Sequence, residues 1–462
     1  MIIAAFTFLR HPARAASLAL ALAFALPAGL RAAESHSVSE KTGDAFQKLK
    51  PLQEAKDWTG MLAILKGIEP SVDPTSYDMS LILNMEGKLY GQMEQYEKTI
   101  EVWDRLLRIS EGKDYLEAKD ISETLYYLSQ FSYTVGLASK VTAVQQKYIS
   151  SAADYFRRYR EGVTNLTPEA QFYYTSLLLN QAMLDPKKVD QSLLKLAHVE
   201  AQKTLQAYVH PKENHYTLLM FILQQENDLA GSAEIIELIL SLFPGKKDFW
   251  PSLWSTYLAM ANEKDATPET VRQNYIRAIN TQERAQAAGF MKSPKDNLNL
   301  VNLYLQAQQF SKGTELLHKW LRDGSVEPDI KNWLALGYYY QQSNQEMTAI
   351  SALKEAVALF PKNGQIDVTI AEIYRGKDLM KEARDHYRSA VKKGNLEKPE
   401  TVLAYLANAD YTLDDFDDAK ATIDEAYQKY PEDCKKDQFL PQLKDAVDRA
   451  LAERAAARAK RS

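Results

Sequence analysis

The chain has 462 residues, of which 45% are hydrophobic and 25% are charged. These proportions are typical of a folded protein and exclude wholesale disorder. The single cysteine, Cys434, excludes an intrachain disulfide and a zinc site built from cysteines. The net charge of −5 argues against nucleic-acid binding, because contacts to phosphate need a basic surface.

The first 33 residues predict an export signal rather than part of the fold. Arg10 and Arg14 give a basic start, an apolar run covers 15–28, and small residues end the segment at Ala33. This three-part pattern is typical of a secretory signal peptide, and the run is shorter than the roughly 20 residues that span a membrane. We therefore expect a periplasmic protein, with an uncleaved inner-membrane anchor as the alternative. Removing residues 1–33 removes three arginines and changes the net charge from −5 to −8.

Residues 330–363 carry a spacing that indicates a helical repeat. With Ile330 as position 1, the residues at positions 4, 7, 8, 11, 20, 24, 27 and 32 are Trp333, Leu336, Gly337, Tyr340, Ala349, Leu353, Ala356 and Pro361. This is the signature of the tetratricopeptide repeat (TPR), a helix–turn–helix unit of about 34 residues. Positions 4, 7 and 11 form the apolar stripe of the first helix, positions 20, 24 and 27 form that of the second, and small residues at 8 and 20 let the helices cross closely.

The same frame divides the rest of the chain into four segments. Residues 34–79 predict a partial first repeat and cap, 80–209 predict divergent helix pairs, and 210–433 predict a regular TPR array. Residues 434–462 predict a capping helix with a basic tail, and any membrane contact through this tail would be peripheral.

No segment shows the alternation of a β-strand. One helix pair cannot bury its own apolar stripe, so neighbouring pairs must stack. We expect about ten pairs in an all-α, TPR-type, right-handed superhelical solenoid of antiparallel helix pairs. Most of the 26 tyrosines are predicted to serve in helix packing.

No catalytic motif is present, since the chain lacks a nucleophile elbow, a phosphate-binding loop, a dinucleotide fingerprint and a zinc-protease motif. We therefore predict a protein that is not an enzyme and holds no cofactor or metal. His210 and His215 flank Glu213, where a metal site or an ordinary loop between repeats would both fit. The acidic cluster at 414–418 lacks the glycine and distal glutamate of a calcium loop, which favours a solvated turn.

In a TPR array the first helix of each pair lines a concave groove, and positions 2, 5, 9, 12 and 13 point into it. The predicted partner-binding residues are Asn302, Leu305, Gln306, Lys331, Leu334, Tyr338, Gln341, Gln342, Glu372, Arg375, Asn408 and Tyr411. This mixture of amide, aromatic and aliphatic groups suits an extended peptide or a partner helix. TPR families that bind chaperone tails clamp a terminal carboxylate with a lysine at position 5, where this chain has Leu334, Val368 and Ala404. A spacer-like solenoid without a dedicated ligand is the alternative.

The frame over about residues 80–433 is identified as that of the TPR superfamily. Within 215–431 the chain resembles bacterial TPR proteins described as components of TonB-type transport systems. The carriers of this resemblance are Leu238–Pro244, Phe249 with Trp250, Leu316–Pro328, Asn332–Gly337 and Ala390–Pro399. The resemblance implies an exported scaffold that helps inner-membrane energy transduction reach outer-membrane receptors. The alternatives are a scaffold for envelope assembly or polysaccharide export, and an enzyme whose solenoid presents its substrate.

Overall fold

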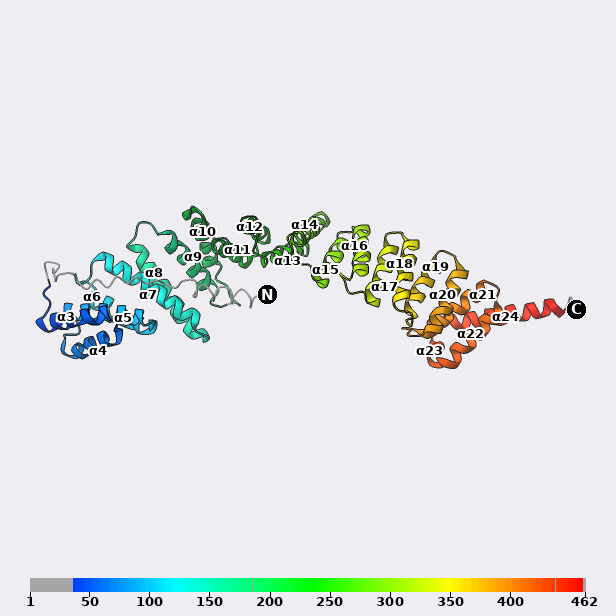
Figure 1. Ribbon diagram of the computed structural model, residues 1–462, viewed down its shortest axis with the longest axis horizontal. Helices are drawn as coiled ribbons and strands as arrows, with labels where there is room; N and C mark the ends of the chain where they lie inside the picture. Colours follow the sequence, from blue (N-terminus) through cyan, green and yellow to red (C-terminus); the bar gives the residue numbers. More distant parts are fainter. Residues whose placement is uncertain (1–35, 186, 437, 460–462) are drawn as a thin grey trace. The chain divides into compact units, whose positions relative to one another are not determined.

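The protein is helical throughout the part of the chain that the structure describes. A computed structural model describes residues 36–185, 187–436 and 438–459, and regular secondary structure in these ranges consists of helices alone. The predicted all-α, TPR-type fold of antiparallel helix pairs is therefore confirmed (Figure 1). The predicted export signal lies outside the described residues. Across the described ranges, every helix is too short or too polar to cross a bilayer.

Residues up to Gly245 form the first compact unit, unit 1. Its helix pairs are α3 (Glu40–Glu54) with α4 (Trp58–Ile68), α5 (Tyr77–Gln92) with α6 (Tyr96–Ser110), α7 (Ala118–Ala138) with α8 (Thr142–Glu161), α9 (Pro168–Ala182) with α10 (Gln191–Ala207), and α11 (Glu213–Gln225) with α12 (Leu229–Leu242). A short 3-10 turn, η1 (Glu69–Ser71), follows α4. The sequence predicts only a partial first repeat, but α3 and α4 form a complete pair because Leu49 and Leu65 share one buried core.

Residues from Lys246 onward form the second compact unit, unit 2. Its helix pairs are α13 (Phe249–Ala261) with α14 (Pro268–Ala287), α15 (Pro294–Gln306) with α16 (Phe310–Asp323), α17 (Ile330–Gln342) with α18 (Glu346–Leu359), α19 (Gln365–Gly376) with α20 (Met380–Lys393), and α21 (Pro399–Thr412) with α22 (Phe416–Lys429). Two further helices, α23 (Pro431–Lys436) and α24 (Phe439–Ala459), end the described chain. The division at Gly245 falls inside the array predicted over 210–433. The limits of that array come from the repeat spacing and not from compactness, so they stay a prediction.

The turns inside seven of the pairs share one backbone conformation. The middle residue of each three-residue turn has a φ between 54° and 63°, and these residues are Lys56, Glu94, Asn227, Gln308, Asn344, Asp378 and Asp414. This left-handed region is unfavourable for most side chains, although asparagine and aspartate tolerate it best. The shared conformation gives these pairs the same tight connection without a glycine.

Small residues let the two helices of a pair approach closely. Gly337 of α17 is one example, since a Cβ atom built on it would lie 2.8 Å from Cδ1 of Leu353 on α18. The facing residue Ala349 is fully buried. In the next two pairs the same positions hold alanines that are also buried: Ala371, Ala383, Ala407 and Ala419. The crossings therefore follow the predicted repeat frame.

In four of the pairs of unit 2, position 11 links the first helix to the second helix of the preceding pair. Hydrogen bonds join Tyr304 to Glu283 at 2.5 Å, Tyr340 to His318 at 2.9 Å, and Tyr374 to Lys354 at 3.2 Å. In α21 an aspartate, Asp410, replaces the tyrosine and accepts a hydrogen bond from Arg388 at 2.7 Å. Burial raises the pKa of Asp410 to about 6, although Arg388 favours its charged form.

Helix α24 covers the last repeat of unit 2. Leu440, Leu443 and Val447 are buried in one cluster with residues of α21 and α22. Cys434 of α23 is fully buried in the same cluster. Beyond this cluster α24 is largely exposed, and Arg454 holds it to Asp417 at 2.6 Å.

Candidate functional site

The twelve predicted groove residues lie on α15, α17, α19 and α21, the first helices of four consecutive pairs of unit 2. Six of them are exposed: Asn302, Gln306, Lys331, Tyr338, Gln342 and Glu372. The other six are partly buried: Leu305, Leu334, Gln341, Arg375, Asn408 and Tyr411. We call these twelve residues the A-helix face. They are accessible because the helical period turns positions 4, 7 and 11 of the same helices into the core.

The A-helix face on α15 and α17 combines amide groups with an exposed aromatic ring. Tyr338 is 55% exposed, and its ring contacts that of Tyr339 edge to face. Within the described residues, the side-chain amides of Asn302, Gln306 and Gln342 form no hydrogen bond to protein. Amides of this kind can donate to and accept from the backbone of a bound polypeptide. Apart from Lys331, this part of the surface therefore offers hydrogen bonds from uncharged groups.

The A-helix face on α19 carries two opposite charges. The guanidinium carbon of Arg375 lies 4.5 Å from the ring centre of Tyr405 on α21, a cation–π distance. Glu372 lies one turn earlier and forms no ion pair within 4.0 Å in the described chain. Burial raises the pKa of Glu372, and the nearby charge of Arg375 offsets part of this rise. The Glu372 residue is exposed as a whole, but its carboxyl group lies close enough to protein for its pKa to rise.

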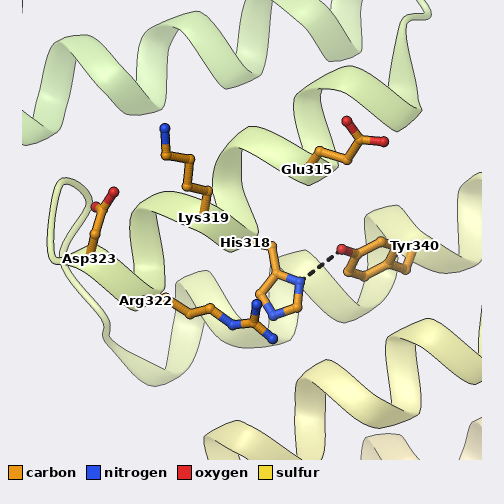
Figure 2. A pocket seen from close by; sticks show the side chains of 6 residues that line it. All are labelled: Glu315, His318, Lys319, Arg322, Asp323 and Tyr340. Carbon is orange, nitrogen blue, oxygen red and sulfur yellow. Dashed lines mark hydrogen bonds between the residues drawn. The ribbon is translucent and has the colours of Figure 1, made fainter.

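A hollow of about 440 Å³, lined by residues of charged and polar types, lies elsewhere in unit 2, along α16 and beside Tyr340 near the end of α17. Its lining residues are Glu315, His318, Lys319, Arg322, Asp323 and Tyr340. Figure 2 shows the ring of His318 between Arg322 and Tyr340. None of these residues belongs to the predicted groove. Sequence reasoning missed the hollow because five of its residues come from a second helix, where no motif marks them.

Three residues of this hollow, His318, Arg322 and Tyr340, are linked directly or through Glu355. His318 Nδ1 lies 2.9 Å from the Tyr340 hydroxyl (Figure 2). The Nε2 atom of His318 lies 3.4 Å from Glu355 of α18. Arg322 donates two hydrogen bonds to the same Glu355 carboxylate, at 2.8 and 2.5 Å. A neutral His318 can donate to Glu355 while it accepts from Tyr340. The cluster therefore joins three consecutive helices.

The titration of His318 should make unit 2 less stable in mild acid. Burial and the charge of Arg322 lower the pKa of His318, and Glu355 only partly opposes them. A histidine with a lowered pKa stabilises the fold above its ordinary pKa of about 6.5, and this contribution is lost as the pH falls. We expect wild type to lose at most about 1.4 kcal/mol more than a His318→Gln variant between pH 7.5 and 5.5.

The measurement is urea-induced unfolding, followed by circular dichroism at both pH values. Asp410 has a raised pKa and contributes with the opposite sign, but it is present in both proteins and cancels in the difference. An identical pH dependence in the two proteins would contradict the role assigned to His318.

The two candidate metal-binding sequences have other roles in the structure. His215 Nδ1 accepts a hydrogen bond from the backbone N–H of Lys212 at 3.0 Å, and its ring stacks on Tyr208, so it caps α11. In the acidic turn, Asp415 pairs with Arg384 of α20 at 2.5 Å. Throughout the described ranges, no three metal-ligating side chains are grouped closely enough to hold an ion.

Tyrosines of α7 and α9 pack against each other in unit 1. The rings of Tyr133 and Tyr173 meet edge to face with centres 5.5 Å apart. The Tyr173 hydroxyl lies 2.7 Å from that of Ser129, and Asn180 donates to Tyr133 at 2.8 Å. Burial raises the pKa of Tyr173 well above its ordinary value. These rings therefore act as packing material between two first helices.

Comparison with known proteins finds similarity at the level of solved structures alone. No protein-family model and no curated protein matches the chain. The chain is similar to YrrB, a TPR protein described as having an unusual peptide-binding site, with 14% identity and a TM-score of 0.30 over 48% of this chain and 94% of YrrB. It is also similar to the type IV pilus biogenesis factor PilW, with 14% identity and a TM-score of 0.29 over 50% of this chain and 97% of PilW. For PilF of Pseudomonas aeruginosa the values are 14% and 0.26, over 48% of this chain and 92% of PilF.

Scores this low carry no functional inference. The TPR-type architecture of this protein rests instead on its own helix pairs, their close crossings and their shared turns.

Proposed function

We propose that this protein is a non-enzymatic scaffold that binds a partner polypeptide on the A-helix face of unit 2. The observation that carries the proposal is that α15 and α17 present unpaired side-chain amides together with the exposed Tyr338, while the opposite side of both helices is buried in the core. An extended polypeptide presents backbone N–H and C=O groups that such amides can pair, while Tyr338 supplies contact area. The proposal gives the face no catalytic, cofactor-binding or metal-binding role.

Replacing Tyr338 and Gln341 by alanine together should weaken partner binding about tenfold and leave the melting temperature unchanged. The aromatic ring is 55% exposed and carries little core packing, so its loss removes contact area from the surface alone. A photo-crosslinking amino acid at the exposed neighbour Gln342 reports binding in cells through the yield of crosslinked polypeptide. The double variant should lower this yield.

A matched control is available on a second helix of the same pair. Met347 and Leu359 of α18 are each 56% exposed, so their double replacement by alanine removes a similar area from another part of the pair. We expect this control to crosslink like wild type. If the control loses the crosslink and the Tyr338 variant keeps it, the partner does not use the A-helix face.

The periplasmic location and the link to a TonB-type system are the finer parts of the proposal, and they are supported by the sequence pattern of residues 1–33 and by the resemblance over 215–431. The crosslinked partner separates the alternatives. A TonB-like protein or an outer-membrane receptor supports the transport role. A polysaccharide-export pore supports a scaffold of envelope assembly instead.

A further inference from the structure

Four arginines of unit 2 pair with a carboxylate, whereas Arg375, on the A-helix face, does not. Arg322 pairs with Glu355, Arg384 with Asp415, Arg388 with Asp410, and Arg454 with Asp417. Within the described residues, Arg375 forms no ion pair. Its neighbour Glu372 has the spacing at which ion pairs form on helices, but the guanidinium stacks on Tyr405 instead. The cation is therefore held in a fixed place without being neutralised.

The hydrogen-bonding groups around Arg375 are also incompletely used. Its Nε atom is buried and has no hydrogen-bond partner. The side chain of Tyr387 on α20 is fully buried, and its hydroxyl faces Arg375, whose charge and side-chain contact both act on that hydroxyl. A guanidinium that is held by an aromatic ring, has an unsatisfied donor and lacks a carboxylate partner is a pre-oriented receptor for a planar anion.

We propose that α19 binds an acidic side chain in the middle of the bound polypeptide, and that Arg375 forms the ion pair with the carboxylate of that side chain. This inference rests on the proposed function, because it assumes that the polypeptide lies on the A-helix face. That face continues from Arg375 to Tyr338 on α17 in one direction and to Asn408 and Tyr411 on α21 in the other. A bound chain therefore passes Arg375 and presents an aspartate or glutamate side chain rather than its terminal carboxylate.

Glu372 should weaken the binding of an acidic peptide, which is the opposite of the effect expected of Arg375. It is exposed on the same helix, one turn from Arg375, and its pKa is raised because protein surrounds its carboxyl group. A carboxylate that approaches Arg375 is repelled by Glu372, so removing this charge should strengthen binding of an acidic peptide. A purely structural role for the two residues would not produce changes of opposite sign.

The test uses the full chain and a phage-displayed library of random dodecapeptides. The peptides are fused at their C-termini, so none presents a free terminal carboxylate. Selection on wild type should enrich peptides with an aspartate or glutamate at one shared position, and selection on Arg375→Gln should not. A selected peptide is then synthesised with either that acidic residue or its amide, and binding is measured by fluorescence anisotropy.

We expect the amide peptide to bind wild type about tenfold more weakly, as is typical of the loss of a charge-assisted hydrogen bond, and to bind Arg375→Gln as well as the acidic peptide does. Glu372→Gln should bind the acidic peptide about twofold more tightly. The control Arg272→Gln removes an exposed arginine of α14, away from the A-helix face, and should change nothing. Where Arg375→Gln melts well below wild type, Arg375→Lys keeps the charge and should retain part of the preference.

The outcomes separate this inference from the proposed function. Selected peptides without a shared acidic residue, or peptides that bind only through a free C-terminus, overturn the role of Arg375 while the A-helix face remains the binding surface. Selected peptides that bind the Tyr338→Ala, Gln341→Ala variant as tightly as wild type overturn the proposed function itself.

Discussion

Replacing Gly87 by alanine should destabilise unit 1 by about 3 kcal/mol or more, which places it among the most damaging single methyl additions in the chain. A Cβ atom on Gly87 would lie 2.0 Å from Nε1 and 2.2 Å from Cδ1 of Trp103. The indole cannot withdraw, because it is 2% exposed and packs in one core with Phe131. It also donates a hydrogen bond to the backbone carbonyl of Asn84 at 3.3 Å. The helices α5 and α6 must therefore separate.

The measurement is urea-induced unfolding of the full chain, followed by circular dichroism. Gly43 of α3 and Gly67 of α4 are the matched controls, since a Cβ atom on either meets nothing within 4 Å. Alanine at each control site should stabilise the unit by about 0.5–1 kcal/mol, because alanine is a better helix former than glycine. Equal unfolding curves for Gly87→Ala and the controls would contradict the close crossing of α5 and α6.

Replacing Asp367 by alanine should destabilise unit 2 by about 2–3 kcal/mol at pH 7. This carboxylate is 2% exposed, lies 3.1 Å from Nδ1 of His386, and accepts from Nζ of Lys393 at 2.5 Å. Its loss leaves both partners half-buried without their acceptor. Burial by itself raises the pKa of Asp367, but the hydrogen bonds from His386 and Lys393 outweigh burial and bring the pKa below its ordinary value.

This lowered pKa fixes the direction of the pH dependence. An aspartate with a lowered pKa stabilises the fold above its ordinary pKa of about 4, and the contribution disappears as the pH falls below that value. The difference between wild type and Asp367→Ala should therefore be complete at pH 7 and shrink below about pH 4. The control is Glu432→Ala, which removes an exposed ion pair with Lys435 and should change stability by less than about 0.5 kcal/mol. A loss as small for Asp367→Ala as for this control would contradict the buried network.

The helix pairs of unit 2 could be predicted because their packing is periodic. Trp333, Gly337 and Tyr340 occupy repeat positions whose apolar or small character recurs along the chain at a fixed spacing. That spacing alone identifies the side of each helix that can be buried. For the pair of α3 and α4 the sequence predicts only a partial repeat, although Phe46 and Trp58 pack against its buried core. The left-handed turn residues were missed because residues such as Glu94 and Gln308 carry no turn signal.

The sequence by itself determined the helical repeat and the crossing residues, because both depend on spacing within about 34 residues. Only the tertiary structure decided which groups meet between repeats. At repeat position 5, Val368 and Ala404 are buried whereas Leu334 is partly exposed. Asp410 pairs with Arg388, and Arg375 stacks on Tyr405 without a carboxylate partner. Such contacts join side chains from different helices at variable separations in the chain, so no local periodicity encodes them.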